Sequence, residues 1–252
     1  MVKIHIKEQN PTKDTFFSGH IEDCIEKYKS GYSKLNQKAV SMDGMIGPPA
    51  RNLLNLLADF DGCRYMQIGT WKGACLYSAL CGNSVDYAIA CDNFSMWTDP
   101  DSIDNQILDL DIMLDLMQPK EQDEIVEFEF YDGNCWEMPL NKIKAPINMY
   151  FYDGGHNCGD HFLSLYYFYP VFDDNFIFVC DDWKEEKVKA GTFAAIQQCH
   201  YKILNSHVYE NLYIAHLQKN THWGESLAVD RLLNTPIQRC ELTNDDIRTY
   251  NK

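Results

Sequence analysis

Short apolar runs alternate with longer segments of helical periodicity along the middle of the chain. The apolar runs predict strands over 63–69, 86–92, 125–133, 147–155 and 175–183. The segments between them predict helices over 73–81, 102–117, 157–169 and 188–200. Strands that alternate with helices in this way are typical of βα units around a parallel sheet.

Both flanks of this region add further elements. Amphipathic stretches over 18–35 predict helix, and Pro48-Pro49 opens a second helix that stops at Asp61-Gly62. Near the other end, YKILNSHVYE and NLYIAHLQKN predict a terminal antiparallel pair of strands. We therefore expect an α/β fold with a doubly wound, mostly parallel seven-stranded sheet, a terminal antiparallel strand and helices on both faces.

Composition narrows the class of protein. The hydrophobic fraction of 45% suits a globular core, and the net charge of −15 repels phosphate backbones, so we expect no nucleic-acid partner. No apolar run approaches the roughly 20 residues of a membrane span, and the first residues lack an apolar signal core, so we expect a cytoplasmic protein. Ten scattered cysteines without a C-x-x-C pair indicate reduced thiols, and the acidic segment 99–124 indicates a solvated helix face.

Small and acidic residues follow three successive strands. The first strand runs into Gly69-Thr-Trp-Lys-Gly73, which is neither G-x-G-x-x-G nor a P-loop and by itself favours an ordinary tight turn. The second strand ends in Asp92, at roughly the 20-residue spacing where an acidic group meets ribose hydroxyls in nucleoside-binding folds. The third leads into Asp132-Gly133-Asn134-Cys135. Together these strand ends predict one ligand-binding crevice.

The motifs QIGTWKGAC, DGNCWEMP, YDGGHNCGDHF and VCDDW, with Asp92 between the first two, occur in the order found in class I S-adenosylmethionine-dependent O-methyltransferases. Over residues 40–200 the chain resembles that family, most of all its catechol-type and macrolide-sugar branch. The resemblance implies transfer of a methyl group from S-adenosylmethionine to a hydroxyl of a small molecule, a sugar or a phenol. It also implies a single methyltransferase domain over 1–252, with a helical framing segment 1–60, a cofactor-binding core 61–200 and terminal strands and tail 201–252.

The resemblance further implies a cofactor site made of residues that follow the predicted strands. Gly69 and Gly73 would flank the methionine part of the cofactor, and Asp92 would hold its ribose hydroxyls. Gln67 departs from the acidic residue that the family usually carries to bind the ammonium group. The full predicted cofactor set is Gln67, Gly69, Trp71, Gly73, Cys75, Asp92, Gly133, Asn134, Cys135 and Asp153.

Three carboxylates are expected at one edge of the sheet. Asp153 closes the fourth strand, and Asp181-Asp182 close the fifth. Such a group repels itself unless a cation or a proton intervenes, and its oxygen ligands suit Mg²⁺, with Ca²⁺ or Mn²⁺ as alternatives. In the metal-dependent branch of the family this trio holds a divalent ion. The alternative is that Asp181 and Asp182 cap the following turn and Asp153 touches only the cofactor.

His156 is the predicted proton acceptor, with Asp153 beside it as the second catalytic residue. An imidazole near its unperturbed pKa of about 6.5 accepts a hydroxyl proton at neutral pH. The family carries a basic residue here, or an acidic one at the position of Gly155. The alternative is a structural histidine, and His161 is interpreted as packing or surface. Among the tryptophans at 97, 136, 183 and 223, only Trp183 is a candidate for the acceptor pocket.

Two other classes of function stay open. Gln67 and Gly155 depart from the family pattern in a way that fits a methyltransferase-like protein that binds the cofactor without catalysis. A nucleotide-sugar or NAD-linked enzyme would need a second phosphate-binding glycine pattern, which the sequence lacks. The sequence leaves the identity of the acceptor open, and it leaves open whether the chain forms a homo-oligomer.

Overall fold

The computed structural model describes residues 13–95, 127–144 and 146–220. Several sequence predictions lie outside these residues. They are the helix at 102–117, the acidic segment 99–124, the first two residues of the strand 125–133, and Trp97, Trp223 and Cys240.

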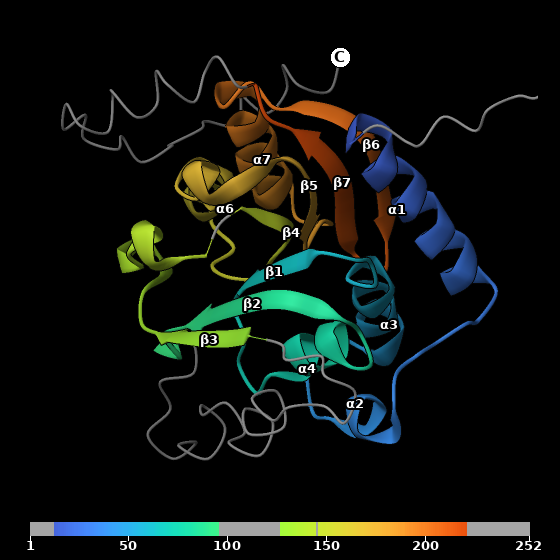
Figure 1. Ribbon diagram of the computed structural model, residues 1–252. Coiled ribbons are helices and arrows are strands. Elements are labelled where there is room, and N and C mark those ends of the chain that lie inside the picture. Colours follow the sequence, from blue (N-terminus) through green and yellow to red (C-terminus); the bar gives the residue numbers. More distant parts are fainter. Residues whose placement is uncertain (1–12, 96–126, 145, 221–252) are drawn as a thin grey trace, which may run out of the picture.

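A seven-stranded sheet forms the centre of the described part (Figure 1). Its strands are β1 (Cys63–Ile68), β2 (Val85–Asp92), β3 (Glu127–Asp132), β4 (Ile147–Tyr152), β5 (Phe172–Cys180), β6 (Lys202–Tyr209) and β7 (Leu212–Gln218). They lie in the order β3-β2-β1-β4-β5-β7-β6, with β1 to β5 parallel and β7 antiparallel to both of its neighbours. The predicted α/β fold with seven strands is confirmed. The antiparallel strand β7 lies between β5 and β6. Of the two terminal strands, the later one, β7, therefore pairs with β5, and β6 lies at the edge of the sheet.

Helices cover both faces of the sheet (Figure 1). Side chains alternate along each strand, so Tyr65 of β1 packs on one face and Met66 on the other. The first face is covered by α1 (Lys13–Lys29) and α3 (Pro48–Leu57), with α4 (Ala74–Leu80) beside them, and the second by α6 (Cys158–Tyr166) and α7 (Glu186–Gln198). The other helices of the described residues are short: α2 (Gln37–Ser41), η3 (Cys135–Glu137), η4 (Leu140–Lys142) and η5 (Tyr169–Val171).

Element ends differ from their predicted positions by a few residues. The predicted strands 147–155 and 175–183 both end three residues early, at Tyr152 and Cys180, because the chain turns at the polar residues that follow. The helix predicted over 18–35 is α1, which gives way to a turn where Gly31 takes a φ of +78°. Each aspartate that was predicted to close β4 or β5 therefore lies just beyond its strand, in a loop that can present it to a ligand.

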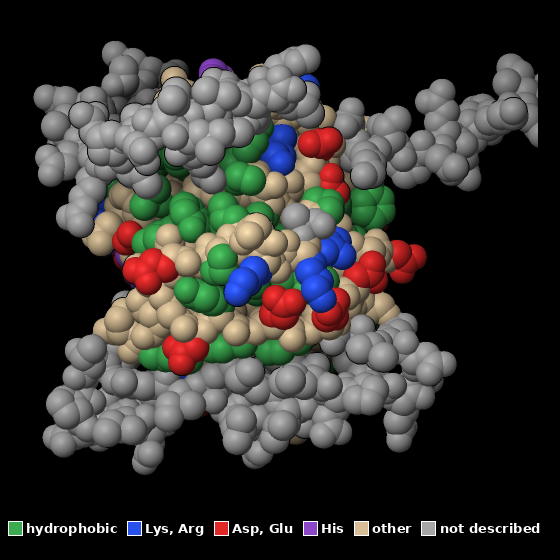
Figure 2. Space-filling view, turned by 60° about the vertical axis from the view of Figure 1, so that its left-hand side comes forward, with side chains coloured by type: hydrophobic (Ala, Val, Ile, Leu, Met, Phe, Trp, Pro, Cys, Tyr) green, Lys and Arg blue, Asp and Glu red, His purple; other side chains and the backbone are tan. Residues whose placement is uncertain are grey.

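The surface and the thiols agree with the composition. On the face in Figure 2, Lys and Arg side chains are interspersed with Asp and Glu. No two of the nine cysteines of the described residues form a disulfide with each other, and most of them are buried in the two cores. None of the described helices has the length and apolar character that a membrane span requires.

Candidate functional site

A cavity of about 350 Å³ opens at the carboxyl ends of β1, β2 and β4. It lies where the strand order changes direction, since β2 and β4 flank β1 on opposite sides. Open α/β sheets bind ligands at such a point, and small-molecule sites are roughly 300–1,000 Å³. The residues of the predicted site that line the cavity are Gln67, Gly69, Trp71, Cys75, Asp92, Gly133, Asn134, Cys135, Asp153 and His156.

Asp92 is bound to the backbone of the glycine turn. Its Oδ2 accepts hydrogen bonds of 2.6 Å from the backbone N–H groups of Thr70 and Trp71. Its Oδ1 accepts a third, of 2.8 Å, from the N–H of Phe94. An ionised carboxylate offers about four lone-pair sites, so most of the acceptor capacity of Asp92 stabilises the turn itself. This differs from a carboxylate that serves ribose hydroxyls alone.

The two glycines of the turn have separate roles. Gly69 has a φ of +83°, and a Cβ placed on it would lie 1.8 Å from the carbonyl oxygen of Asp153. Gly73 has a φ of +86° and is the N-cap of α4, with its N–H donating to Thr70 O at 2.8 Å. Neighbouring backbone therefore requires glycine at 69, and helix geometry favours it at 73. Gly73 is not among the residues that line the cavity.

Gln67 uses both ends of its amide within the protein. Its Oε1 accepts a hydrogen bond of 2.7 Å from the Tyr65 hydroxyl, and its Nε2 donates to Gly69 O at 2.8 Å. The side chain is buried at the base of the cavity. At the position where the resemblance implies an acidic residue, this chain has a neutral amide whose hydrogen bonds stabilise the start of the turn.

The wall of the cavity formed by the residues after β3 is largely apolar and carries no charge. Asn134 caps η3 by accepting a hydrogen bond from Trp136 N at 3.1 Å. Burial raises the pKa of the Cys135 thiol to about 12, so it carries no charge at neutral pH. The Cys75 thiol, which lines the cavity from α4, is kept neutral in the same way, because burial raises its pKa well above its usual range. Trp136 stacks on Tyr152 with 6.5 Å between ring centroids. This wall suits a flat, uncharged ring.

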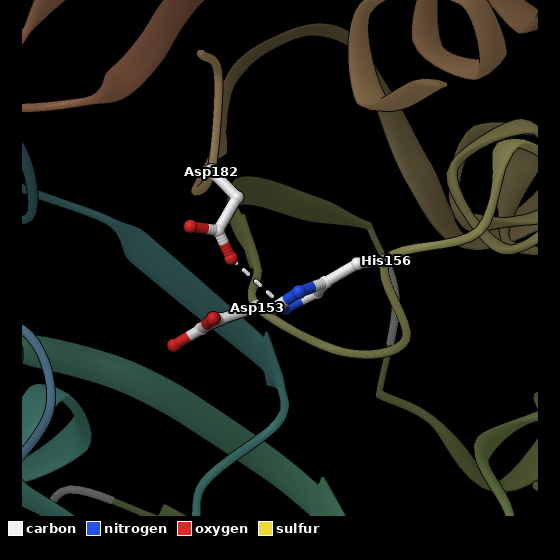
Figure 3. Close-up of side chains that lie close together, drawn as sticks. All are labelled: Asp153, His156 and Asp182. Atoms are coloured by element: carbon white, nitrogen blue, oxygen red, sulfur yellow. Dashed lines mark ion pairs between the residues drawn. The ribbon is translucent and has the colours of Figure 1, made fainter. Parts of the chain in front are cut away.

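An acidic edge adjoins the cavity (Figure 3). His156 Nε2 lies 2.9 Å from Asp182 Oδ2, and one donor atom from each of Asp153, His156 and Asp182 lies within 4.8 Å of the others. Burial, with repulsion from Asp181 and Asp182, holds the pKa of the Asp153 carboxyl well above its usual range. Burial also raises the pKa of Asp181 to about 6, but Asp181 is not part of this group. The structure thus places His156, in addition to the predicted Asp153 and Asp182, at the candidate metal site.

Two further candidates belong to the core. Trp183 is buried and stacks on Tyr213 with 4.0 Å between ring centroids, so it is not a wall of the cavity. His161 is also buried, with Nδ1 3.4 Å from the sulfur of Cys180, and burial lowers its pKa to about 3. The interpretation of His161 as a packing residue is confirmed.

The comparison with solved structures identifies the fold. The O-methyltransferase NovP superposes with a TM-score of 0.50 at 11% sequence identity, over 83% of this chain and 100% of NovP. This chain has the class I methyltransferase fold. Two weaker matches are an O-methyltransferase from Bacillus cereus in complex with SAH (TM-score 0.48, 12% identity, 86% of this chain and 94% of that chain) and MycE from the mycinamycin biosynthetic pathway in complex with Mg and SAH (0.44, 11%, 80% and 55%). No protein-family model and no curated protein matches the sequence.

In this methyltransferase fold, part of the cavity is lined by a loop that the sequence analysis did not predict as part of the site. Gly44, Met45 and Ile46, between α2 and α3, line the cavity. A Cβ on Gly44 would lie 2.7 Å from the Cβ of Ala74, so the loop sits directly against the start of α4. The only signal for this loop in the sequence is Gly44, which precedes the helix that starts at Pro48-Pro49. Met45 is 61% exposed and thus available to a ligand at the entrance.

Proposed function

We propose that the chain is an S-adenosylmethionine-dependent methyltransferase that acts on a hydroxyl of a small molecule. The observation that carries the proposal is the cavity at the switch point of a methyltransferase fold, which is lined by ten of the predicted site residues at or after the ends of β1, β2, β3 and β4. The net charge of −15 favours a small-molecule acceptor over a nucleic acid. Neighbouring hydroxyls, as in a sugar or a phenol, suit the acidic edge beside the cavity.

The cavity residues fit this cofactor in distinct ways. When bound, S-adenosylmethionine supplies a methyl group activated by a positively charged sulfonium. Asp92 holds the turn after β1 in place and keeps about one lone-pair direction for a ribose hydroxyl. Trp136 and the neutral thiol of Cys135 provide an apolar surface for the adenine ring. Asp153 lines the cavity, and a cationic ligand beside it would favour the ionised form of a carboxyl whose pKa burial and the neighbouring aspartates raise.

The acidic edge would hold the acceptor end of the reaction. Asp153 and Asp182 offer carboxylate oxygens that suit a divalent ion such as Mg²⁺, which lowers the pKa of a bound hydroxyl. In the ion-free protein His156 is the proposed proton acceptor, since Asp182 fixes its ring through Nε2. The chain's contribution is to align the acceptor oxygen with the methyl group and to exclude water.

The test separates binding from catalysis. Isothermal titration of the whole protein with S-adenosylmethionine and with S-adenosylhomocysteine measures the cofactor site. Turnover is then followed by mass spectrometry with a panel of sugars and phenols. Binding with methylated product supports the proposal. Binding without product from any acceptor favours the non-catalytic alternative. The hydrogen bonds of Gln67 to Tyr65 and Gly69 are consistent with that alternative, because they occupy the side chain that departs from the family pattern. No binding of either compound would refute the cofactor site.

A further inference from the structure

The acidic edge combines two kinds of ligand atom. Asp153 and Asp182 contribute carboxylate oxygens, and His156 contributes a ring nitrogen. They come from two loops, one after β4 and one after β5, which meet because these strands are parallel neighbours (Figure 3). The sequence predicted Asp153, Asp181 and Asp182 as metal ligands, and the group that lies close together among the described residues has His156 where that prediction has Asp181.

The spacing of these atoms fits a coordination shell. Bonds to transition ions are about 2.0–2.2 Å, so two adjacent ligands of one ion lie about 3 Å apart and two opposite ligands about 4 Å. His156 Nε2 and Asp182 Oδ2 are 2.9 Å apart, and the whole group fits within 4.8 Å. The three ligand atoms are therefore close to the spacing that the ligands of a single ion require.

A second carboxylate lies near the other ring nitrogen of His156. His156 Nδ1 lies 4.0 Å from Glu185 Oε1, at the residue before the first turn of α7. Histidines that bind metals usually direct their second ring nitrogen toward a carboxylate, which fixes the tautomer and makes the ligating nitrogen more basic. At 4.0 Å the Glu185 carboxylate is beyond hydrogen-bond distance of Nδ1, but it lies on the side of the ring where such a partner would stand.

We propose that Asp153, His156 and Asp182 form a site for a first-row transition-metal ion, and that the imidazole makes it bind such an ion in preference to Mg²⁺. Imidazole suits transition ions, whereas Mg²⁺ keeps oxygen ligands. The inference deepens the proposed function, on which it rests, by naming the ion at the acceptor end. A histidine with Nε2 on an ion has no free lone pair, so its role as proton acceptor applies only to the ion-free protein.

Mn²⁺ is the probe, because it is paramagnetic and also accepts oxygen-rich sites. Competition titrations on the full chain measure the Kd of Mn²⁺ and of Mg²⁺, without any acceptor or turnover. We expect Mn²⁺ to bind at least about tenfold more tightly than Mg²⁺. Pulsed electron paramagnetic resonance of the Mn²⁺ complex should show coupling to a ¹⁴N nucleus, which a site of three carboxylates would not give.

Three variants test the ligand set. His156→Gln should raise the Kd of Mn²⁺ at least about tenfold and remove the ¹⁴N coupling, while the Kd of Mg²⁺ changes little. Asp181→Asn should weaken both ions by no more than a few-fold, through lost charge. His207→Gln is the matched control, since His207 Nε2 lies 3.0 Å from Glu22 Oε1 in a similar pair on the surface, and it should change neither.

Several results would overturn the inference. These are no Mn²⁺ binding, no ¹⁴N coupling in the unaltered protein, or a loss of Mn²⁺ affinity in Asp181→Asn that exceeds the loss in His156→Gln. Each variant is first shown to be folded by its circular dichroism and thermal melt. Titration with S-adenosylmethionine is run separately in chelator, so failure of the cofactor proposal is seen independently of failure of the metal site.

Discussion

Asp92, at the end of β2, accepts a hydrogen bond of 2.6 Å from the backbone N–H of Trp71 in the turn after β1. Trp71 has a φ of +43°, which a residue with a Cβ adopts only when its surroundings stabilise it. The side chain of Asp92 on β2 thus fixes the backbone conformation of the turn that follows the neighbouring strand β1. The shape of the proposed cofactor site depends on this cross-strand contact as much as on the glycines.

Asp92→Ala should therefore affect both binding and stability. The substitution removes three accepted hydrogen bonds, and each one to a charged group contributes about 1.5–3 kcal/mol. We expect the Kd for S-adenosylmethionine to rise at least about tenfold and the free energy of unfolding to fall by about 2 kcal/mol or more. Calorimetric titration and urea denaturation measure the two. Asp86→Ala, at an exposed position on the same strand, is the control. Unchanged affinity in a folded Asp92→Ala protein would contradict the assignment of this crevice.

Gly69→Ala tests whether backbone contact or ligand contact requires this glycine. The new Cβ would lie 1.8 Å from Asp153 O, so the end of β1 must move away from β4, and we expect a loss of at least about 2 kcal/mol in unfolding free energy. Gly62→Ala is the matched control: Gly62 also has a positive φ, of +76°, but no atom lies within 4 Å of its added Cβ. It should lose only about 1 kcal/mol. Equal losses in the two variants would show that the φ angle, and not the Asp153 carbonyl, is the reason for glycine at 69.

The architecture could be predicted well from the sequence, because the spacing of apolar residues follows which side chains are buried, and that spacing differs between strands and helices. It also placed Asp92, Asp153 and Asp182 at strand ends on one edge, since parallel strands align their carboxyl ends. It could not predict which backbone groups Asp92 would bind, because that depends on the positive φ of Trp71. Trp183 was misjudged for a similar reason. It stacks on Tyr213, and only the insertion of β7 beside β5 brings Tyr213 there.

The imidazole of His161 should make stability depend on pH. Burial lowers its folded-state pKa to about 3, and its Nε2 is one of the described buried atoms without a hydrogen-bond partner. The unfolded chain takes up a proton near pH 6.5 while the folded protein does not, so stability is complete above pH 6.5 and is lost as pH falls toward 3. We expect His161 to contribute a slope of about 1 kcal/mol per pH unit below pH 6.

Replacing His161 should remove that slope. His161→Leu deletes the titrating group and the unpaired nitrogen, so its unfolding free energy between pH 6 and pH 5 should be flatter than that of the unaltered protein. Denaturation at a series of pH values measures the difference. His207→Gln changes a half-buried histidine of the surface instead and should keep the original slope over this range. An identical pH dependence in His161→Leu would show that other groups, such as the partly buried His20, account for the loss of stability in acid.

Removal of metal should separate the two halves of the proposed site. If a divalent ion sits between Asp153 and Asp182, excess chelator abolishes methyl transfer and added divalent metal restores it, while S-adenosylmethionine still binds because the ion contacts the acceptor end. Asp182→Asn should reproduce the effect of chelator, since it deletes one ligand and leaves the cavity wall intact. Asp153→Asn should differ by weakening cofactor binding too, because Asp153 lines the cavity that Asp182 does not. Turnover and calorimetric titration on the same preparations give both readouts. Full turnover in excess chelator, on protein shown by elemental analysis to hold no metal, would eliminate the ion and return the proton of the acceptor to His156.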